Sequence, residues 1–282
     1  MSRPFRFGTM TSPFTPFAQL VEQAQAAEDA GFDLFLLPDF ANAISPIPTL
    51  AALAGHTSTL RFSPLVVNAG LWRADLLVRE FLSADQITGG RVEIGLGAGN
   101  APGGPAKPLT HLRGVLQALR ASLEDPENRP GWVSKPPVVI AGSGDNLLRA
   151  AGELADIVGL AGPFPAPVGL APGHIPLLSP AATAERIAAV RAGAGARFKA
   201  IELNVGAEVH VTDDRRAAAE QAHQVHGYLS VEEILASPKF LAGTVEQIAE
   251  QLLGHRERYG LSYFVVIGIT AAEFAPVIAA LR

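Results

Sequence analysis

Short apolar runs alternate with amphipathic stretches along the whole chain. Most of the apolar runs are almost continuously hydrophobic, which is the pattern of parallel β-strands that helices cover. Eight such runs predict strands, at residues 5–10, 32–38, 60–68, 91–97, 137–141, 157–161, 201–212 and 262–268.

The stretches between these runs carry apolar residues at helical spacing. The stretch 17–31 predicts a helix with one apolar face, which Gly31 is expected to end. Thr244 begins a T-x-x-Q capping-box pattern that opens a second helix. The stretches 182–192 and 214–225 predict two more.

Eight strand–helix units in 282 residues fit a (β/α)8 barrel, or TIM barrel, that forms a single α/β domain over the whole chain. A doubly wound open sheet is the alternative. The stretch 162–180 is rich in Pro and Gly and has no periodicity. It therefore predicts a long loop, which we expect to be mobile or functional.

Composition excludes several classes of protein. Hydrophobic residues make up 48% of the sequence, which is enough for a sizeable core. The net charge is −5, and both signs are scattered without a basic cluster, which argues against a nucleic-acid-binding surface. The sequence contains no cysteine, which excludes disulfides, thiolate metal sites and a cysteine nucleophile.

The N-terminal segment Met1-Ser2-Arg3-Pro4 lacks the apolar core and the cleavage site of a signal peptide. The longest apolar runs, such as 34–38, are too short to span a bilayer. We therefore expect a cytoplasmic protein that does not bind a membrane.

Candidate site residues follow the predicted strands, because ligands bind a barrel at the carboxyl ends of its strands. Asp39 is the only carboxylate at a predicted strand end in the first four units, although an Asx turn or loop cap explains it equally well. Gly142, Ser143 and Gly144 lead into a helix predicted to start near Asp145. Backbone N–H groups at such a start bind phosphate, and an ordinary strand-to-helix turn is the alternative.

The glycines Gly95, Gly97 and Gly99 resemble a nucleotide-binding loop at first sight. Their G-x-G-x-G spacing differs from the G-x-G-x-x-G fingerprint of dinucleotide-binding proteins, and a Pro- and Gly-rich loop follows where the fingerprint requires a helix. We interpret them as positions where the backbone comes close to a flat ligand.

Metal and hydrolase chemistry find no support in the sequence. The seven histidines form neither H-x-H nor H-E-x-x-H, and His223 and His226 are expected to be solvated on a polar helix. We therefore predict no metal site. No G-x-S-x-G pattern is present, so a hydrolase triad has no nucleophile position.

Several segments together resemble the bacterial luciferase-like flavin and deazaflavin oxidoreductases. The strongest is 85–99, which is similar to the LD-x-LSGGR-x-x-LGLG-x-G segment of that family. Within the superfamily, the chain is most similar to the actinobacterial coenzyme F-420-dependent branch. The other matches occur in family order at 26–33, 36–39, 48–54, 59–62, 65–68, 136–144, 155–158, 211–214, 241–244 and 259–263.

The resemblance implies a barrel, often dimeric, that binds FMN or the deazaflavin coenzyme F-420 at its C-terminal face. It assigns catalysis to Asp39 and Asn68, and it places a cis peptide bond, expected at Pro64–Leu65, behind the ring. The substrate pocket that it implies contains Phe40, Trp72 and His174. The cofactor-binding residues that it implies are Asp39, Pro64, Leu65, Asn68, Gly97, Gly99, Asn100, Gly142, Ser143 and Gly144.

Two departures from the family concern proton donors. Many deazaflavin-dependent relatives have a histidine where this chain has Phe40 and a glutamate where it has Asn100. His and Glu are natural proton donors. Either Asp39, Asn68 or His174 serves instead, or the chemistry needs no protein acid.

The sequence therefore predicts a flavin- or deazaflavin-dependent oxidoreductase, expected as a homodimer. It would transfer hydride to a small organic substrate or activate oxygen on it. The alternative is a luciferase-like barrel that has lost redox catalysis and binds a ligand or a partner.

Overall fold

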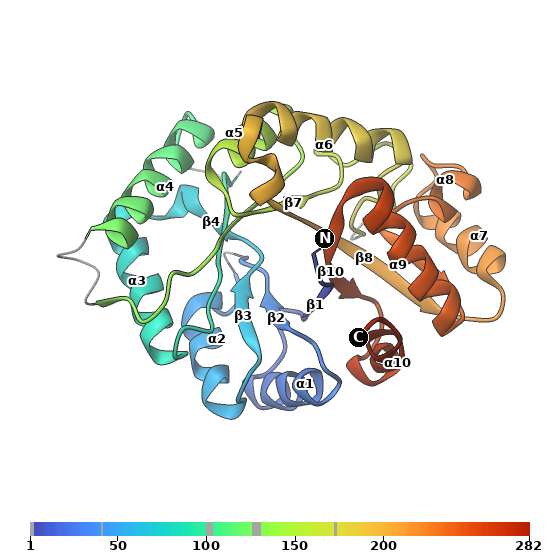
Figure 1. Cartoon of the computed structure of the whole chain (residues 1–282), viewed down its shortest axis with the longest axis horizontal. Coiled ribbons are helices and arrows are strands. Elements are labelled where there is room, and N and C mark those ends of the chain that lie inside the picture. The colour runs from blue at the N-terminus through green and yellow to red at the C-terminus, as the bar shows by residue number, and fades with distance from the viewer. Residues whose placement is uncertain (1–2, 41, 100–103, 126–130, 172–173) are drawn as a thin grey trace. The chain divides into compact units, whose positions relative to one another are not determined.

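The computed structural model describes residues 3–40, 42–99, 104–125, 131–171 and 174–282 (Figure 1). Asn100 lies outside the described residues. The chain divides into two compact units. The first comprises Met1–Thr9, Gly142–Glu153 and Val158–Arg282, and the second comprises Met10–Ala141 and Leu154–Ile157. A single domain remains a prediction.

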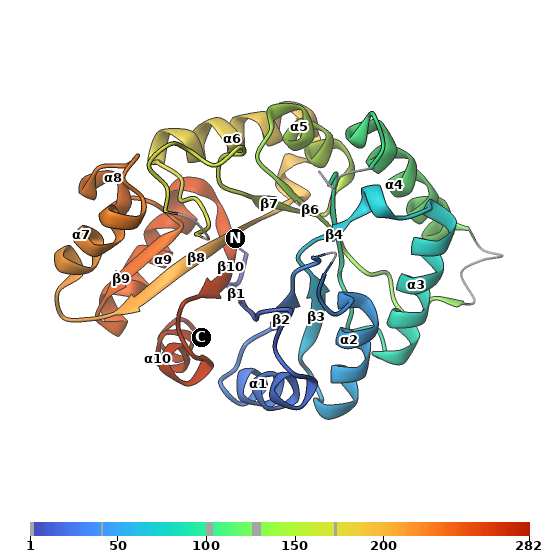
Figure 2. The ribbon, with the colours of Figure 1, turned by 180° about the vertical axis from the view of Figure 1, so that it is seen from behind.

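The first unit is a parallel α/β unit built around β10 (Leu261–Ile267), a strand in which all residues except the last are buried. β10 pairs with β1 (Arg6–Met10) and with β8 (Glu202–Val211), as Figure 2 shows, and β8 also pairs with β9 (Phe240–Gly243). The strand β7 (Ile157–Leu160) also contributes to this unit. Its helices are α5 (Asp145–Leu154), α6 (Pro180–Ala194), α7 (Arg215–Val225), α8 (Val231–Leu235), α9 (Val245–Tyr259) and α10 (Ala271–Leu281).

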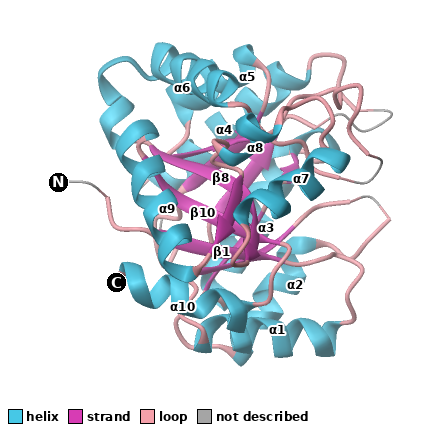
Figure 3. Ribbon diagram, turned by 90° about the vertical axis from the view of Figure 1, so that its right-hand side faces the viewer, coloured by secondary structure: helices cyan, strands magenta, loops and turns pink. Residues whose placement is uncertain are grey.

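The helix α9 shows how local sequence sets these elements. Thr244 accepts the backbone N–H of Gln247, and the Gln247 side chain accepts the Thr244 N–H in return, so the predicted capping box is confirmed. The helix ends at Gly260, whose φ of 72° favours glycine. Its buried face, which includes Leu252, packs against β9 and β10. Figure 3 shows α9 beside β10.

The second unit is also parallel. β2 (Leu34–Leu37) pairs with β3 (Arg61–Pro64), and β5 (Ile94–Gly97) pairs with β4 (Val67–Asn68) and with β6 (Val138–Gly142). Its helices are α1 (Phe17–Asp29), α2 (Pro46–Leu53), α3 (Ala74–Ile87) and α4 (Pro108–Glu124).

The predicted elements agree with the structure except in a few places. The predicted third strand is broken into β3 and β4, and the cis peptide bond is Leu65–Val66, so the expectation at Pro64–Leu65 is wrong by one residue. Pro64 is the last residue of β3, opposite Leu37, and the N–H of Leu65 still donates to the Leu37 carbonyl, so the hydrogen bonding to β2 continues up to the cis peptide bond.

The strand β9 was not predicted, because a four-residue apolar run has no periodicity to identify it. The helix α6 begins earlier than expected, at Pro180, because Ser179 accepts the backbone N–H of Ala182 and caps it. The predicted loop 162–180 therefore ends at Ser179. Its mobility stays a prediction.

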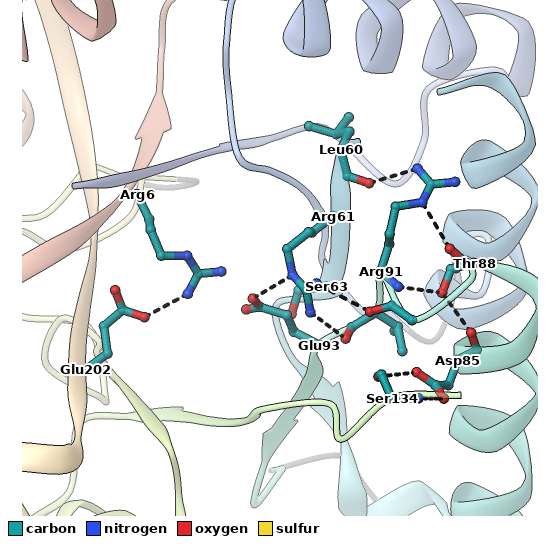
Figure 4. A network of polar contacts seen from close by, with 12 residues as sticks. Arg6, Leu60, Arg61, Ser63, Asp85, Thr88, Arg91, Glu93, Ser134 and Glu202 are labelled. Atoms are coloured by element: carbon teal, nitrogen blue, oxygen red, sulfur yellow. Dashed lines mark hydrogen bonds and ion pairs between the residues drawn. The ribbon is translucent and has the colours of Figure 1, made fainter. Parts of the chain in front are cut away.

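The motif 85–93 forms the polar core of the second unit (Figure 4). The fully buried Asp85 accepts the Ser134 backbone N–H at 2.9 Å and the Ser134 hydroxyl at 2.5 Å. Arg91 donates to the backbone carbonyls of Leu60 at 3.0 Å and Thr88 at 2.9 Å. These residues of the resemblance therefore hold backbone segments together.

The motif 26–33 also has a structural role. The carboxylate of Glu28 accepts the backbone N–H groups of Ser58, Thr59 and Leu60. Partial burial acts to raise the pKa of Glu28, but the hydrogen bonds from Thr59, Ser58 and Leu60 outweigh it and lower the pKa to about 2. Glu28 thus joins α1 to the turn before β3.

Candidate functional site

Asp39 and Asn68, the two predicted catalytic residues, lie together in the second unit. They follow β2 and end β4, and the backbone N–H of Asn68 donates to Asp39 Oδ2 at 3.0 Å. Asn68 Oδ1 accepts the N–H of Gly70 at 3.0 Å and so caps the short helical turn Ala69–Leu71. The hydrogen bond to Asp39 comes from a different strand, so it is not the local Asx turn of the alternative interpretation.

Each side chain of this pair has a second polar atom. Among the described residues, Asp39 Oδ1 and Asn68 Nδ2 have no hydrogen-bond partner. Both side chains are half-buried. The pair therefore presents one carboxylate acceptor and one amide donor at the carboxyl ends of β2 and β4.

Three alternate glycines along β5 and just beyond it lie against the segment that contains the cis peptide bond. A Cβ on any of them would meet that segment too closely: on Gly97 it would lie 2.7 Å from Val66 Cγ2, and on the other two it would overlap. The pairs are Gly95 with Pro64, Gly97 with Val66 and Gly99 with Asn68. Gly99 also has a φ of 77°.

This finding changes the meaning of the glycine pattern. The space that the side chains of Gly97 and Gly99 would fill is occupied by Val66 and Asn68 of the same chain. Packing within the protein therefore requires these glycines whether or not a flat ligand is present. Their contact with a cofactor remains a prediction, as it does for Pro64.

The predicted substrate-pocket residues of the second unit have clear neighbours. Phe40 is 52% exposed and stacks on Phe14, with ring centroids 6.3 Å apart. Trp72 is half-buried, and its backbone carbonyl lies 3.0 Å from His111 Nε2. His111 also lies 3.0 Å from the carbonyl of Ala69 and so holds the turn beside Asn68. Sequence reasoning missed both Phe14 and His111, because each is far in sequence from its neighbour.

The segment Gly142, Ser143, Gly144 ends β6 and leads into α5, which begins at Asp145 as predicted. Asp145 lies in the first turn, where its charge complements the helix dipole. A phosphate at this helix start would therefore meet a carboxylate there. Phosphate binding by this segment remains a prediction.

His174, the third predicted pocket residue, lies in the first unit. It lines a cavity of about 180 Å³ together with the charged residues Glu208 and Lys239. Sequence reasoning missed both, because β8 and β9 bring them together from distant parts of the chain. The only sequence signal was a lysine directly before a short apolar run.

His226 corrects one expectation. It was expected to be solvated, but its side chain is 0% exposed. The helix α7 ends at Val225, and His226, which follows it as the C-cap, forms a backbone bridge with Leu170. Its Nε2 lies 3.5 Å from Glu208 Oε1. His223, in contrast, is an exposed residue, and its Nδ1 lies 2.7 Å from the Leu229 carbonyl oxygen.

The part of the chain that the structure describes contains neither a metal-binding cluster nor a membrane-spanning helix. In that part of the chain, no group of three His, Cys, Asp or Glu side chains has the arrangement of a metal site. No helix that the structure describes is long and apolar enough to cross a membrane.

Solved structures similar to this chain define its fold. A coenzyme F420-dependent tetrahydromethanopterin reductase from Methanopyrus kandleri has a TM-score of 0.75 and 16% sequence identity, covering 99% of this chain and 100% of that one. The oxygenating constituent of 3,6-diketocamphane monooxygenase from Pseudomonas putida, in complex with FMN, has a TM-score of 0.67 and 17% identity, covering 98% and 95%. The fold is the predicted luciferase-like (β/α)8 barrel, and the doubly wound alternative is wrong.

Residues 1–262 match the model of the luciferase-like monooxygenase family, and the chain belongs to this family. Among curated proteins, it is similar to the 5,10-methylenetetrahydromethanopterin reductase of Methanolobus tindarius, with 26% identity over 169 residues, which are 53% of this chain and 52% of that protein. The chain spans about half the length of the curated relatives it matches.

Proposed function

We propose that this protein is an oxidoreductase that uses coenzyme F-420 or FMN on a small organic substrate. Membership of the luciferase-like family supports the class of reaction. A similar solved structure is F420-dependent and another contains FMN, which supports these two cofactors. We favour coenzyme F-420, because the Methanopyrus kandleri tetrahydromethanopterin reductase is F420-dependent. The similar curated proteins are also reductases that act on a tetrahydromethanopterin derivative.

The observation that carries the proposal is the pair Asp39 and Asn68. A flavin or deazaflavin ring has a pyrimidine edge with an N–H donor and carbonyl acceptors. Asp39 Oδ1 and Asn68 Nδ2, which have no partner among the described residues, provide one acceptor and one donor of the matching kind. This acceptor and this donor therefore fit the pyrimidine edge of such a ring.

The residues of the chain bind and orient, and the bound ring supplies the hydride chemistry. Asp39 Oδ2 is held by the Asn68 backbone, so that the carboxylate keeps one orientation while its other oxygen accepts a hydrogen bond. Asn68 is held in turn through Gly70 and donates from its amide. Phe40 presents an exposed aromatic ring that excludes water when a ligand covers it.

Fluorescence titration of the purified protein with coenzyme F-420 and, separately, with FMN tests the proposal. We expect binding of one of them at micromolar affinity or better. Asp39→Ala should weaken that binding about tenfold or more, because it removes a hydrogen bond to a charged group. The exposed Asp213 provides the control, and Asp213→Asn should bind as the unchanged protein does.

Failure of both cofactors to bind would overturn the proposal. The barrel would then be a ligand-binding protein without redox chemistry, an alternative that the exposed Phe40 supports because many deazaflavin-dependent relatives have a histidine at this position. Homodimer formation and a cytoplasmic location are further proposals that rest on the family resemblance. Sedimentation analysis of the purified chain tests the first of them.

A further inference from the structure

Lys239, the residue before β9, is a buried charged group. It is only 4% exposed, and lysine is rarely buried to this extent. Its backbone carbonyl accepts the N–H of Glu208 at 2.9 Å, and its own N–H donates to Ser237 Oγ at 3.1 Å. These contacts fix Lys239 beside β8, where its side chain lines the cavity described above.

The rest of the cavity is mostly apolar. Ile175, Leu177 and Ile267 form its walls. Gly206 keeps it open on the β8 side, because a Cβ there would lie 3.2 Å from Ile267 Cδ1. A volume of about 180 Å³ is below the range of about 300–1,000 Å³ that is usual for drug-sized ligands. The cavity therefore suits a small molecule with an apolar body.

The charges around the cavity do not balance. Among the described residues, the Lys239 ammonium makes no hydrogen bond and no ion pair. Glu208 is the nearby carboxylate, but its Oε1 lies 3.5 Å from His226 Nε2. Arg186, a second cation, lies close enough to act on Lys239. A buried ammonium without a direct partner is costly, so a ligand with an anionic group would stabilise it.

The protonation state of Lys239 is compatible with this role. Burial lowers the pKa of its ammonium, Glu208 acts in the opposite direction and Arg186 lowers it further, to a value of about 8. Lys239 is therefore mostly cationic at neutral pH and loses its charge just above it.

We propose that this cavity binds a small monocarboxylic acid. The carboxylate pairs with Lys239, and a short apolar chain lies against Ile175, Leu177 and Ile267. Glu208, which also lines the cavity, disfavours a second negative charge on the ligand, so that a carboxylate monoanion binds better than phosphate or a dicarboxylate. The site lies entirely within the first unit, and the proposal does not depend on a redox function.

Isothermal titration of the full chain with pentanoate and pentanamide tests this proposal. The two probes have similar size, and only pentanoate carries a charge. We expect the Kd of pentanoate to be at least about tenfold lower than that of pentanamide, and we expect Lys239→Met to remove this difference. Lys199 is exposed, and Lys199→Met should leave both affinities unchanged.

The pH dependence provides a second readout that needs no variant. Between pH 7 and 10, pentanoate affinity should fall as Lys239 loses its proton at about pH 8. The other groups near it are Glu208 and Arg186, together with His174, His226 and Tyr228 around the same cavity. Burial raises the pKa of Tyr228, so this phenol stays neutral through the fall.

Three results would overturn the proposal. They are equal binding of pentanamide and pentanoate, unchanged pentanoate binding by a folded Lys239→Met variant, and tighter binding of inorganic phosphate than of pentanoate. If Lys239→Met does not fold, the comparison of the two probes and the pH profile decide. Pentanoate binding that persists without any cofactor affinity would leave this site standing and the proposed redox function refuted.

Discussion

Glu28→Gln removes one negative charge from the place where α1 holds the turn before β3. Glutamine keeps the shape of the side chain and one carbonyl oxygen, so the change tests the charge itself. In the structure, the Glu28 carboxylate lies 2.9 Å from the Ser58 N–H nitrogen, 2.6 Å from that of Thr59 and 2.8 Å from that of Leu60. The Thr59 hydroxyl donates to it as well, at 2.9 Å.

The magnitude follows from the pKa of Glu28. The difference between 4.5 and about 2 corresponds to about 3.4 kcal/mol, at about 1.36 kcal/mol for each pH unit. Because Glu28 is close to solvent, screening reduces this figure, and we expect a loss of about 1–2 kcal/mol in the free energy of unfolding at pH 7.

The sign of the pH dependence is fixed by the direction of the shift. The folded pKa lies below the unfolded one, so the stabilisation is complete above pH 4.5 and is lost as the pH falls towards 2. Urea unfolding of the original protein and of Glu28→Gln at pH 7, 4 and 3 measures this. The difference should shrink steadily with pH, whereas Glu22→Gln, an exposed change on the same helix, should have no effect.

Two results would refute the reasoning about Glu28. One is an unchanged free energy of unfolding in Glu28→Gln at pH 7. The other is a loss of the same size at every pH, which would assign the effect to side-chain packing.

Three further predictions concern stability. Gly97→Ala should lose about 1–3 kcal/mol in urea unfolding, because its Cβ would lie 2.7 Å from Val66 Cγ2, and Val66→Ala in the same chain should restore part of the loss. Ser134→Ala should lose about 1–3 kcal/mol, because the buried Asp85 loses a hydrogen bond; no change would contradict that contact. Burial, with Arg215 and Arg258 nearby, lowers the pKa of His255 to about 4, so NMR titration should show a neutral ring down to about pH 5. Because the unfolded chain takes up this proton more readily, the free energy of unfolding should decrease as the pH falls from 6.5 to 4.

Local patterns made much of the fold predictable. The capping box at Thr244 and the apolar strand Leu261–Ile267 depend on neighbours in the sequence, and both have the predicted type in the structure. The break between β3 and β4 has no such signal, because Leu65 and Val66 continue an apolar run. The strand β9 is equally hard to recognise, because its partner β8 lies about thirty residues earlier.

In the candidate site, too, some residues could be predicted from the sequence and others depend on contacts between distant segments. Asp39 is predicted from its position after a strand and Asn68 from the family resemblance, and the structure joins them by a hydrogen bond. Lys239 was not identified, because its importance comes from burial and from Glu208, which only the pairing of two strands reveals. The sequence also showed three glycines without showing what lies against them.

Those glycines have a consequence for the redesign of the two neighbouring segments. Residues 97 and 99 leave their side-chain volume to Val66 and Asn68, so each of these two pairs shares the room for one side chain, whereas a Cβ at residue 95 would overlap the backbone carbonyl of Pro64. A larger residue at position 97 is compatible with this backbone only when position 66 becomes smaller. A library that varies residue 97 should therefore vary residue 66 at the same time, whereas residue 95 has to stay glycine whatever side chain stands at residue 64.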